Sequence, residues 1–294
     1  MYVYLNNRTI PSGEARVSVF DHGFLYGDGI YETMRVYDGV VFMFDEHIER
    51  LHRSASLIHL DLPKDSAAIK MAVYDTLKAN YLTNAYVRVT VSRGHGPIGL
   101  DPALCKEPTF VVIATDFKDY PRSFYDEGIK LMIVSVRRNI REALNPQIKS
   151  LNFLNNILAK IETKQTDSYE ALMLNSEGYL AEGAISNIFF VRDKVLCTPS
   201  IECGILDGIT RGLVLAIAAR SGVTVEEGDF APEDLYLATE VFVTNTTMEV
   251  MPVSRVDAAH FDVGEITKLL MANYRHEVKA YVREKKGESP SLWQ

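Results

Sequence analysis

The sequence predicts an α+β protein of two domains, because strand-like and helix-like stretches follow each other without a regular strand–helix alternation. The chain has 294 residues, enough for two hydrophobic cores. Near its start, Asp38-Gly39 separates two apolar stretches at 30–36 and 40–44. An Asp-Gly pair between apolar stretches is typical of a tight turn, so we expect a β-hairpin there.

The other elements of the first half follow from hydrophobic periodicity. We expect strands at 3–5, 85–92 and 109–115, and helices at 45–58 and 66–80. Pro121 lies in a polar stretch and ends the preceding strand. We therefore expect a smaller first domain at 1–120, a linker at 121–130 and a larger second domain at 131–294.

In the second half, a helix is expected at 151–166, where Leu151, Leu154, Leu158 and Ile161 form one apolar stripe. A second helix is expected at 210–221, ended by Gly222. The expected strands are 129–136, 170–175, 188–192, 195–197, 223–226 and 240–244.

Composition excludes several classes of protein. The net charge is −8 and no long basic block occurs, which argues against nucleic acid or an anionic membrane as partner. No apolar stretch approaches membrane-spanning length, and the first residues lack a signal pattern. The three cysteines have no metal-ligand or disulfide spacing, and the histidines show no ligand pattern. We expect a soluble cytoplasmic protein without a metal site.

One lysine and one acid suggest a cofactor. Lys149 lies beside a short polar turn, and Glu182 precedes a stretch of small residues. A pyridoxal phosphate enzyme needs an amine that forms the Schiff base and a carboxylate that keeps the pyridine nitrogen protonated. Lysine and glutamate are common surface residues, so the pair alone is weak evidence.

Three further segments could bind the phosphate of that cofactor. Glycines in 204–208 precede a helix whose first turn holds Thr210, and backbone N–H groups at a helix start favour an anion. A second candidate is the polar turn 244–249, and a third is Arg50. Each also has an ordinary structural explanation, as a capped turn or as a surface arginine.

Strand alternation indicates where a substrate carboxylate would bind. Tyr31 and Arg35 share one face of their strand, and Tyr86 and Arg88 share one face of theirs. Arginine suits a carboxylate because its planar guanidinium donates two parallel hydrogen bonds. The alternative is a solvated polar face, which is common in antiparallel sheets.

Taken together, these blocks closely resemble the fold-type IV pyridoxal phosphate enzymes, or class IV aminotransferases. The similar segments are 24–32, 46–51, 148–152, 182–187, 206–211 and 246–253. The resemblance implies a two-domain α+β fold like that of D-amino acid aminotransferase, with the cofactor in the cleft between domains. It also implies a homodimer that completes the active site.

The resemblance assigns roles by position. Lys149 matches the lysine that forms the Schiff base, and Glu182 matches the partner of the pyridine nitrogen. The residues that match phosphate ligands are Arg50, Ile209 through its backbone N–H, Thr210 and Thr246. Leu206 matches the apolar residue against the ring, and Thr247 one whose backbone meets the substrate carboxylate.

Within the family, Tyr86-Val87-Arg88 is similar to the branched-chain amino acid aminotransferases, as are Tyr31 and Arg35. We therefore expect amino transfer from L-branched-chain amino acids to 2-oxoglutarate. The expected substrate-binding residues are Tyr31, Arg35, Tyr86, Arg88, Arg93 and Thr247. Thr33 and the stretch 92–96 are similar to aminodeoxychorismate lyase. The lyase and D-amino acid transaminase remain alternatives, as does a non-enzymatic pyridoxal phosphate binder.

Overall fold

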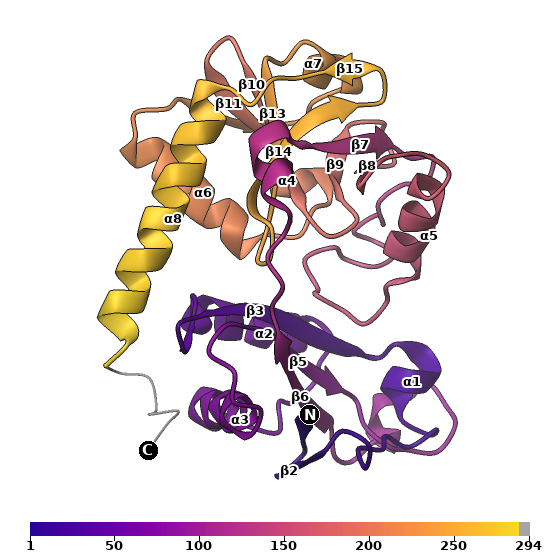
Figure 1. Cartoon of the computed structure of the whole chain (residues 1–294). Helices are drawn as coiled ribbons and strands as arrows, with labels where there is room; N and C mark the ends of the chain where they lie inside the picture. Colours follow the sequence, from indigo (N-terminus) through magenta and orange to yellow (C-terminus); the bar gives the residue numbers. More distant parts are fainter. Residues whose placement is uncertain (288–294) are drawn as a thin grey trace. The chain divides into compact units, whose positions relative to one another are not determined.

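The computed structural model describes residues 1–287, which form two compact units (Figure 1). The first unit contains Met1–Lys118, Ile148–Asn152 and the described residues from Val278 onward. The second contains Asp119–Gln147 and Phe153–Glu277. Each unit has its own sheet with helices, which confirms the predicted α+β class.

Within the described residues, the first unit is built on a six-stranded sheet in the order β2-β1-β6-β5-β3-β4. The strands are β1 Tyr2–Leu5, β2 Arg8–Pro11, β3 Gly29–Tyr37, β4 Val40–Val41, β5 Ala85–Ser92 and β6 Thr109–Asp116. All neighbouring pairs are antiparallel. The predicted hairpin is the β3–β4 pair, and its turn at Asp38 and Gly39 has positive φ at both residues.

Strand alternation determines which face of this sheet is the core. In β5, Ala85, Val87, Val89 and Val91 are buried, while the polar side chains between them are less so, as predicted. The helices are α1 His22–Tyr26, α2 Phe44–Leu57 and α3 Ser66–Ala79, with a 3-10 turn at Pro102–Leu104. Helices α2 and α3 pack against the sheet and bury the apolar residues of its inner face.

The second unit contains a nine-stranded sheet among the residues described. The strand order is β12-β11-β10-β13-β14-β7-β8-β9, with β15 paired to β14 and β9 also paired to β10. The strands are β7 Ile129–Ile133, β8 Glu170–Leu174, β9 Leu180–Gly183, β10 Asn187–Arg192, β11 Val195–Pro199, β12 Val225–Gly228, β13 Glu240–Asn245, β14 Glu249–Val256 and β15 Ala259–His260. Strands β8 and β9 are buried along their whole length.

The helices of the second unit are α4 Arg122–Glu127, α5 Leu154–Thr163, α6 Ile209–Arg220, α7 Pro232–Tyr236 and α8 Glu265–Lys285, with a 3-10 turn at Ile201–Cys203. Helix α6 is the predicted helix, and Gly222 follows it with a φ of 72°. Helix α8 was not predicted. Its N-terminus is held by the buried Glu240, which accepts from the backbone N–H of Thr267 at 2.7 Å.

Helix α5 differs from its prediction in two ways. It begins at Leu154 and not at Leu151, because the segment Ile148–Asn152 pairs with β3. Its apolar stripe also faces outward: Leu154, Ile157, Leu158 and Ile161 are exposed. Polar and small residues hold its inner side, since the Asn156 side chain donates to the Ala184 carbonyl at 2.7 Å and Ala159 is buried.

The segment expected as a linker is more ordered than a linker needs to be. Residues 121–130 hold helix α4 and the first residues of β7. Phe124 packs edge-on against Tyr169, with ring centroids 5.1 Å apart, which anchors α4 to its own unit. The contact boundary falls between Lys118 and Asp119. The expected domain ranges differ from the contact-based units mainly at the lysine-bearing segment and at the end of α8.

Candidate active site

The segment that carries Lys149 is held against β3. The backbone N–H of Tyr31 donates to the Lys149 carbonyl at 3.0 Å, and that of Leu151 donates to the Gly29 carbonyl at 2.9 Å. The Lys149 N–H in turn donates to the Ser54 hydroxyl of α2 at 3.1 Å. Lys149 therefore has a fixed backbone, while its four-carbon side chain can still move the amine.

A cluster of cationic and aromatic side chains surrounds Tyr31. The Lys149 amine lies 4.6 Å from the Tyr31 ring centroid, and the Arg88 guanidinium carbon lies 3.9 Å from the same centroid. The register of β3 and β5, with Tyr31 opposite Thr90 and Thr33 opposite Arg88, brings Arg88 to this ring. Burial raises the pKa of the nearby Tyr86 phenol, against the effect of Arg88, so Tyr86 stays protonated at neutral pH.

Arg50, a predicted phosphate ligand, belongs to a buried network in the same unit. Its Nε and Nη2 donate to the two oxygens of Glu32 at 2.7 and 2.9 Å. The other partner of Glu32 is His47 Nδ1, also at 2.7 Å. Since an ionised carboxylate only accepts, Nδ1 carries the proton. Glu32 is fully buried on β3, at a position for which the sequence predicted no function.

The charges of this network follow from its burial. Burial tends to raise the pKa of Glu32, but Arg50 and His47 outweigh it and hold that pKa far below its ordinary value. Burial lowers the pKa of His47, so the imidazole is neutral at pH 7. Glu32 therefore stays negative, and it orients the guanidinium of Arg50.

Arg35 shares the face of Tyr31 but is engaged with its own unit. Its Nη1 donates to the Val36 carbonyl at 2.7 Å. Its guanidinium carbon lies 3.6 Å from the Phe117 ring centroid and 4.7 Å from that of Tyr37. Only 5% of Arg35 is exposed. These contacts favour a structural role over the predicted contact with substrate.

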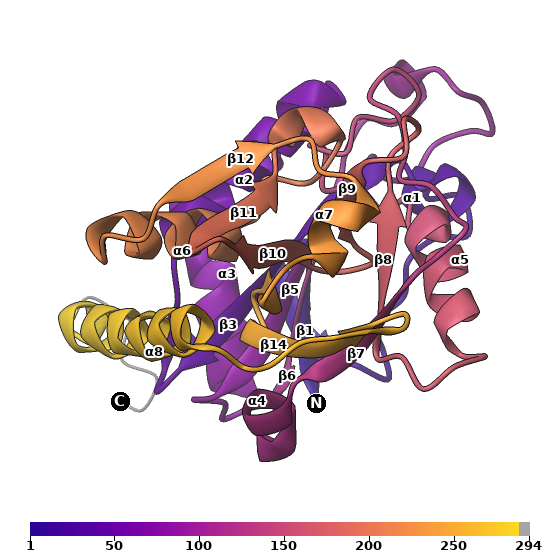
Figure 2. The same ribbon diagram turned by 90° about the horizontal axis from the view of Figure 1, so that it is seen from above.

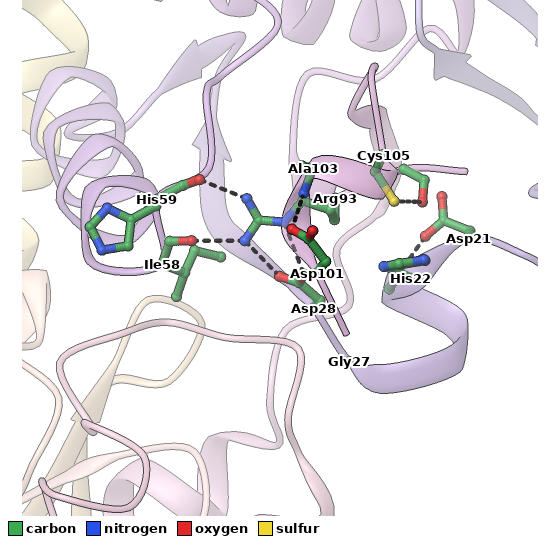
Figure 3. A network of polar contacts seen from close by, with 12 residues as sticks. Asp21, His22, Gly27, Asp28, Ile58, His59, Arg93, Asp101, Ala103 and Cys105 are labelled. Atoms are coloured by element: carbon green, nitrogen blue, oxygen red, sulfur yellow. Dashed lines mark hydrogen bonds and ion pairs between the residues drawn. The ribbon is translucent and has the colours of Figure 1, made fainter. Parts of the chain in front are cut away.

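Arg93 is engaged in the same way by a larger set of partners (Figure 3). Its Nε and Nη2 donate to both oxygens of Asp28, at 2.9 and 3.0 Å. It also donates to the carbonyls of Ile58 and His59, at 2.7 Å each. Arg93 thus ties the end of β5 to the loop before β3 and to the end of α2. This explains its burial without a substrate.

In the second unit, Glu182 is held by three donors. Arg138 Nε donates to Oε1 at 2.6 Å, and the Leu206 N–H and Asn187 Nδ2 donate to Oε2 at 3.0 and 3.2 Å. Only 5% of Glu182 is exposed. Glu182 and Leu206 were predicted from the sequence, but Arg138 was missed, because it lies in an irregular segment with no pattern that marks it.

Asn187 is the centre of this arrangement. It pairs with Glu182 across β9 and β10 and with Thr244 across β10 and β13. Its Nδ2 also donates to the Leu206 carbonyl at 3.0 Å. A Cβ on Gly208 would lie 2.0 Å from the Asn187 side-chain oxygen, so the start of α6 must approach Asn187 without a side chain. Asn187 therefore brings together the acid, Leu206 and the start of α6.

Two predicted phosphate-binding segments lie close to Asn187. Helix α6 begins after Gly208 with no side chain capping its first turn, and Thr210 is buried there. The turn after β13, the strand that pairs with Asn187, contains Thr246 and Thr247. Asn245 Oδ1 accepts from the N–H groups of Thr247 and Met248 at 2.9 and 2.7 Å. The Thr247 N–H, predicted to meet substrate, therefore already has an acceptor.

The donor set of the second unit fits an anionic aromatic cofactor. An ionised acid, an apolar side chain at Leu206 and an uncapped helix start suit a pyridinium, a ring face and a phosphate. The buried hydroxyls of Ser186 and Thr244 have no hydrogen-bond partner within the described structure, which leaves polar capacity beside Asn187. The first unit contains the amine of Lys149.

Residues 1–287 contain neither a candidate metal centre nor a membrane span. No group of three or more His, Cys, Asp or Glu side chains in this range could hold a metal ion. None of its helices is both long and apolar enough to cross a membrane.

Known proteins that are similar to this chain point to one family. A family model described as amino-transferase class IV matches residues 29–256. A protein of Methanocaldococcus jannaschii, provisionally named a branched-chain-amino-acid aminotransferase, is 44% identical over 94% of this chain and 96% of its own length. An aminodeoxychorismate lyase of Bacillus subtilis is 33% identical over 98% of both chains. A D-alanine aminotransferase of Listeria innocua is 32% identical over 96% of this chain and 97% of its own length.

Among solved structures, a branched-chain aminotransferase of Thermoproteus uzoniensis with norvaline has a TM-score of 0.90 and 34% identity, over 96% of this chain and 97% of that one. A branched-chain amino acid aminotransferase of T.th., solved with pyridoxamine 5'-phosphate, has a TM-score of 0.91 and 29% identity, over 97% and 96%.

Proposed function

Because this chain belongs to the class IV aminotransferase family, we propose that it transfers the amino group of L-branched-chain amino acids to 2-oxoglutarate. Membership confirms the resemblance found in the sequence and the expected cofactor, pyridoxal 5'-phosphate. The general activity is that of a pyridoxal phosphate-dependent aminotransferase, with amino acids and 2-oxo acids as substrates. The choice of L-branched-chain substrates and of 2-oxoglutarate is our proposal.

The observation that carries the proposal is the cluster of Lys149, Tyr31 and Arg88 in the first unit. Two cationic groups near one aromatic ring attract a carboxylate, and the ring offers an apolar surface to an aliphatic side chain. Tyr86, next to Arg88, adds a protonated phenol as hydrogen-bond donor. An α-amino acid with a branched apolar side chain combines these two requirements.

Lys149 is the proposed catalytic base. When bound, the cofactor supplies an electron sink for the carbon that loses its proton. The Lys149 amine moves that proton, and its backbone bonds to Tyr31 and Ser54 keep the amine near the reacting carbon. Glu182, charged and held by Arg138, would keep the ring nitrogen protonated.

The phosphate would be held mainly by donors of the second unit. We assign it to the N–H of Ile209, to Thr210 and to Thr246, together with Arg50 of the first unit. Leu206 is assigned to the ring face.

Three residues leave the predicted set of substrate contacts. The donors of Arg35, Arg93 and Thr247 are engaged within their own units, which leaves a structural explanation for each. Arg35 and Arg93 are instead proposed as positioning residues for the sheet that carries Tyr31 and Arg88.

Two relatives support alternative activities. D-alanine aminotransferases and aminodeoxychorismate lyase match almost the whole chain at similar identity. Arg88 favours the L-branched-chain assignment over both, because the Tyr-x-Arg strand resembles the branched-chain group. Loss of cofactor colour with both enantiomers of leucine, alanine and glutamate separates the transaminases. Pyruvate release from aminodeoxychorismate would identify the lyase.

The expected result is fast amino transfer with L-leucine and L-glutamate and slow transfer with the D-enantiomers. The matched variant is Arg88→Gln, which keeps a donor but loses the charge. Its KM for L-leucine should rise about ten-fold, because a charge-assisted hydrogen bond contributes about 1.5–3 kcal/mol. A preference for D-alanine would replace the L-branched-chain assignment, while leaving the family unchanged.

We also propose a cytoplasmic homodimer. Large apolar side chains are exposed in both units: Leu154, Ile157, Leu158 and Ile161 on α5, and Phe24, Ile98 and Leu100 in the first unit. Such surfaces mark protein–protein contacts more often than free surface. Sedimentation at micromolar concentration should give twice the mass of one chain, and Leu158→Glu should lower it. The free thiols Cys105, Cys197 and Cys203 fit a reducing compartment.

A further inference from the structure

Helix α8 runs beside α6 in the second unit, where both views of the chain show the two helices together (Figures 1 and 2). Two polar contacts join them near the end of α6. Arg220 Nη2 lies 2.7 Å from Glu277 Oε1, and the Asn273 side chain donates to the Ser221 hydroxyl at 3.1 Å. The start of α6, where Thr210 lies, is reached by a different residue of α8.

That residue is Tyr274. It is almost completely buried, and its phenol is hydrogen-bonded to the side chain of Thr210. Burial raises the pKa of Tyr274 far above its ordinary value, and nearby Glu249 acts in the same direction. The phenol therefore keeps its proton at neutral pH and remains able to donate.

The next residue of α8, Arg275, contacts the other phosphate-binding segment. Its Nε lies 3.6 Å from Glu249 Oε2, directly after the turn that holds Thr246. The Arg275 guanidinium also lies 5.0 Å from the Tyr125 ring centroid, and the Tyr125 hydroxyl donates to the Met248 carbonyl at 3.3 Å. Consecutive residues of one helix thus contact both segments.

We propose that Tyr274 and Arg275 are positioning residues for the cofactor phosphate: Tyr274 acts through the Thr210 hydroxyl, and Arg275 through the turn at Thr246. This inference rests on the proposed function, which assigns Thr210 and Thr246 to the phosphate. Neither positioning residue is required to touch the cofactor itself.

The chemistry of the hydroxyl explains why Tyr274 matters. A threonine hydroxyl has one proton to donate and two lone pairs to accept. When Tyr274 donates to the Thr210 oxygen, the Thr210 proton is left for a phosphate oxygen. Hydrogen bonds in such a chain polarise one another, which strengthens the bond to the anion. Phenylalanine at 274 keeps the ring but removes this donor.

The test measures cofactor affinity, with the protein freed of cofactor and titrated with pyridoxal 5'-phosphate or with pyridoxal, which lacks the phosphate. Tyr274→Phe should weaken binding of the phosphorylated form about five- to ten-fold and leave pyridoxal binding unchanged. In a Thr210→Val background, Tyr274→Phe should have no further effect. The ³¹P resonance of the bound phosphate should shift in Tyr274→Phe. Glu249→Gln, on the better exposed side, should weaken phosphate-dependent binding about two- to three-fold.

Tyr281→Phe is the matched control, because it removes a phenol from the same helix away from Thr210. It should bind both forms as the parent does. Equal loss for both forms in Tyr274→Phe, or no loss, would overturn the inference. If Tyr274→Phe does not fold, Glu249→Gln decides the Arg275 contact alone. Failure of the parent protein to bind pyridoxal 5'-phosphate would instead overturn the proposed function.

Discussion

The two units contribute to the candidate site in different ways. In the first unit, ionisable side chains dominate: Lys149, Arg88 and Arg50, with the buried Glu32 paired to Arg50. In the second unit, backbone geometry dominates around Glu182, through the start of α6, the turn after β13 and the Leu206 N–H. The first half therefore depends on charge, and the second on the paths of the strands that meet at Asn187.

This difference has a practical meaning for substitutions. Backbone N–H groups survive a change of side chain, so the second half should tolerate mutation except at Glu182 and at the crowded Gly208. Side-chain charges do not survive, so the first half should show the strong effects on rate and on pH dependence. We expect the loss of function or stability to be largest at Lys149 and smaller at Glu182 and Glu32.

Lys149→Ala should have the largest effect. Turnover should fall by about four orders of magnitude, because no other amine is assigned to the proton transfer. Borohydride treatment of the cofactor-loaded protein should no longer add mass, as measured by intact mass spectrometry. The fold should persist, since the contacts at this position use the backbone. Retained amino transfer would remove Lys149 from its role and weaken the contrast between the units.

Glu182→Gln tests the one side chain on which the second unit depends. Turnover should fall on the order of 100-fold, because a neutral amide no longer favours a protonated ring nitrogen. Cofactor affinity should change little, since the phosphate ligands are untouched. Single-turnover measurement of proton loss from the substrate checks the rate.

Arg138→Gln is the companion variant, because it frees Glu182 from its ion pair and should have a smaller effect. An unchanged proton-transfer rate in Glu182→Gln would count against the role of Glu182.

Glu32→Gln tests the buried network of the first unit. At pH 7 the free energy of unfolding should fall by about 3–5 kcal/mol, because Arg50 would be left without its buried counter-charge. Denaturant titration of the variant and the parent gives the difference. If the two proteins were equally stable at pH 7, Glu32 would not be the counter-ion that the geometry indicates.

The same network predicts the pH dependence. Glu32 has a folded pKa below its unfolded value of 4.5, so its contribution is present above pH 4.5 and is lost as the pH falls. His47 has a folded pKa below 6.5, so the unfolded chain gains a proton first and stability also declines below that pH. The parent should therefore lose more stability than Glu32→Gln between about pH 6 and pH 3, as followed by thermal unfolding.

Local patterns predicted much of the fold, and the exceptions have physical causes. Alternation placed β5 and its buried face correctly, and the glycine after α6 marked its end. The strand expected at 40–44 stops after Val41, because Met43 has a φ of 51° and α2 begins at Phe44. The start of α5 was placed too early, since pairing with β3 is a long-range contact that periodicity does not contain.

For the site, the sequence revealed residue types but not their partners. Motifs indicated Lys149 and Glu182, while the contacts of Arg138 with Glu182 and of Tyr274 with Thr210 were missed, because they join distant parts of the chain. Position beside a strand suggested that an arginine at the end of β5 meets substrate, whereas its geometry shows two carbonyls and a carboxylate around it.

The pairing of Ile148–Asn152 with β3 limits how this protein can be cut. A fragment that ends at Lys118 would lose the strand-like neighbour of Gly29 and Tyr31, because that neighbour comes from a later part of the chain. The bare backbone groups of β3 would then be open to other molecules, a common origin of aggregation. Engineers who want the N-terminal half alone should append this pentapeptide through a short connection.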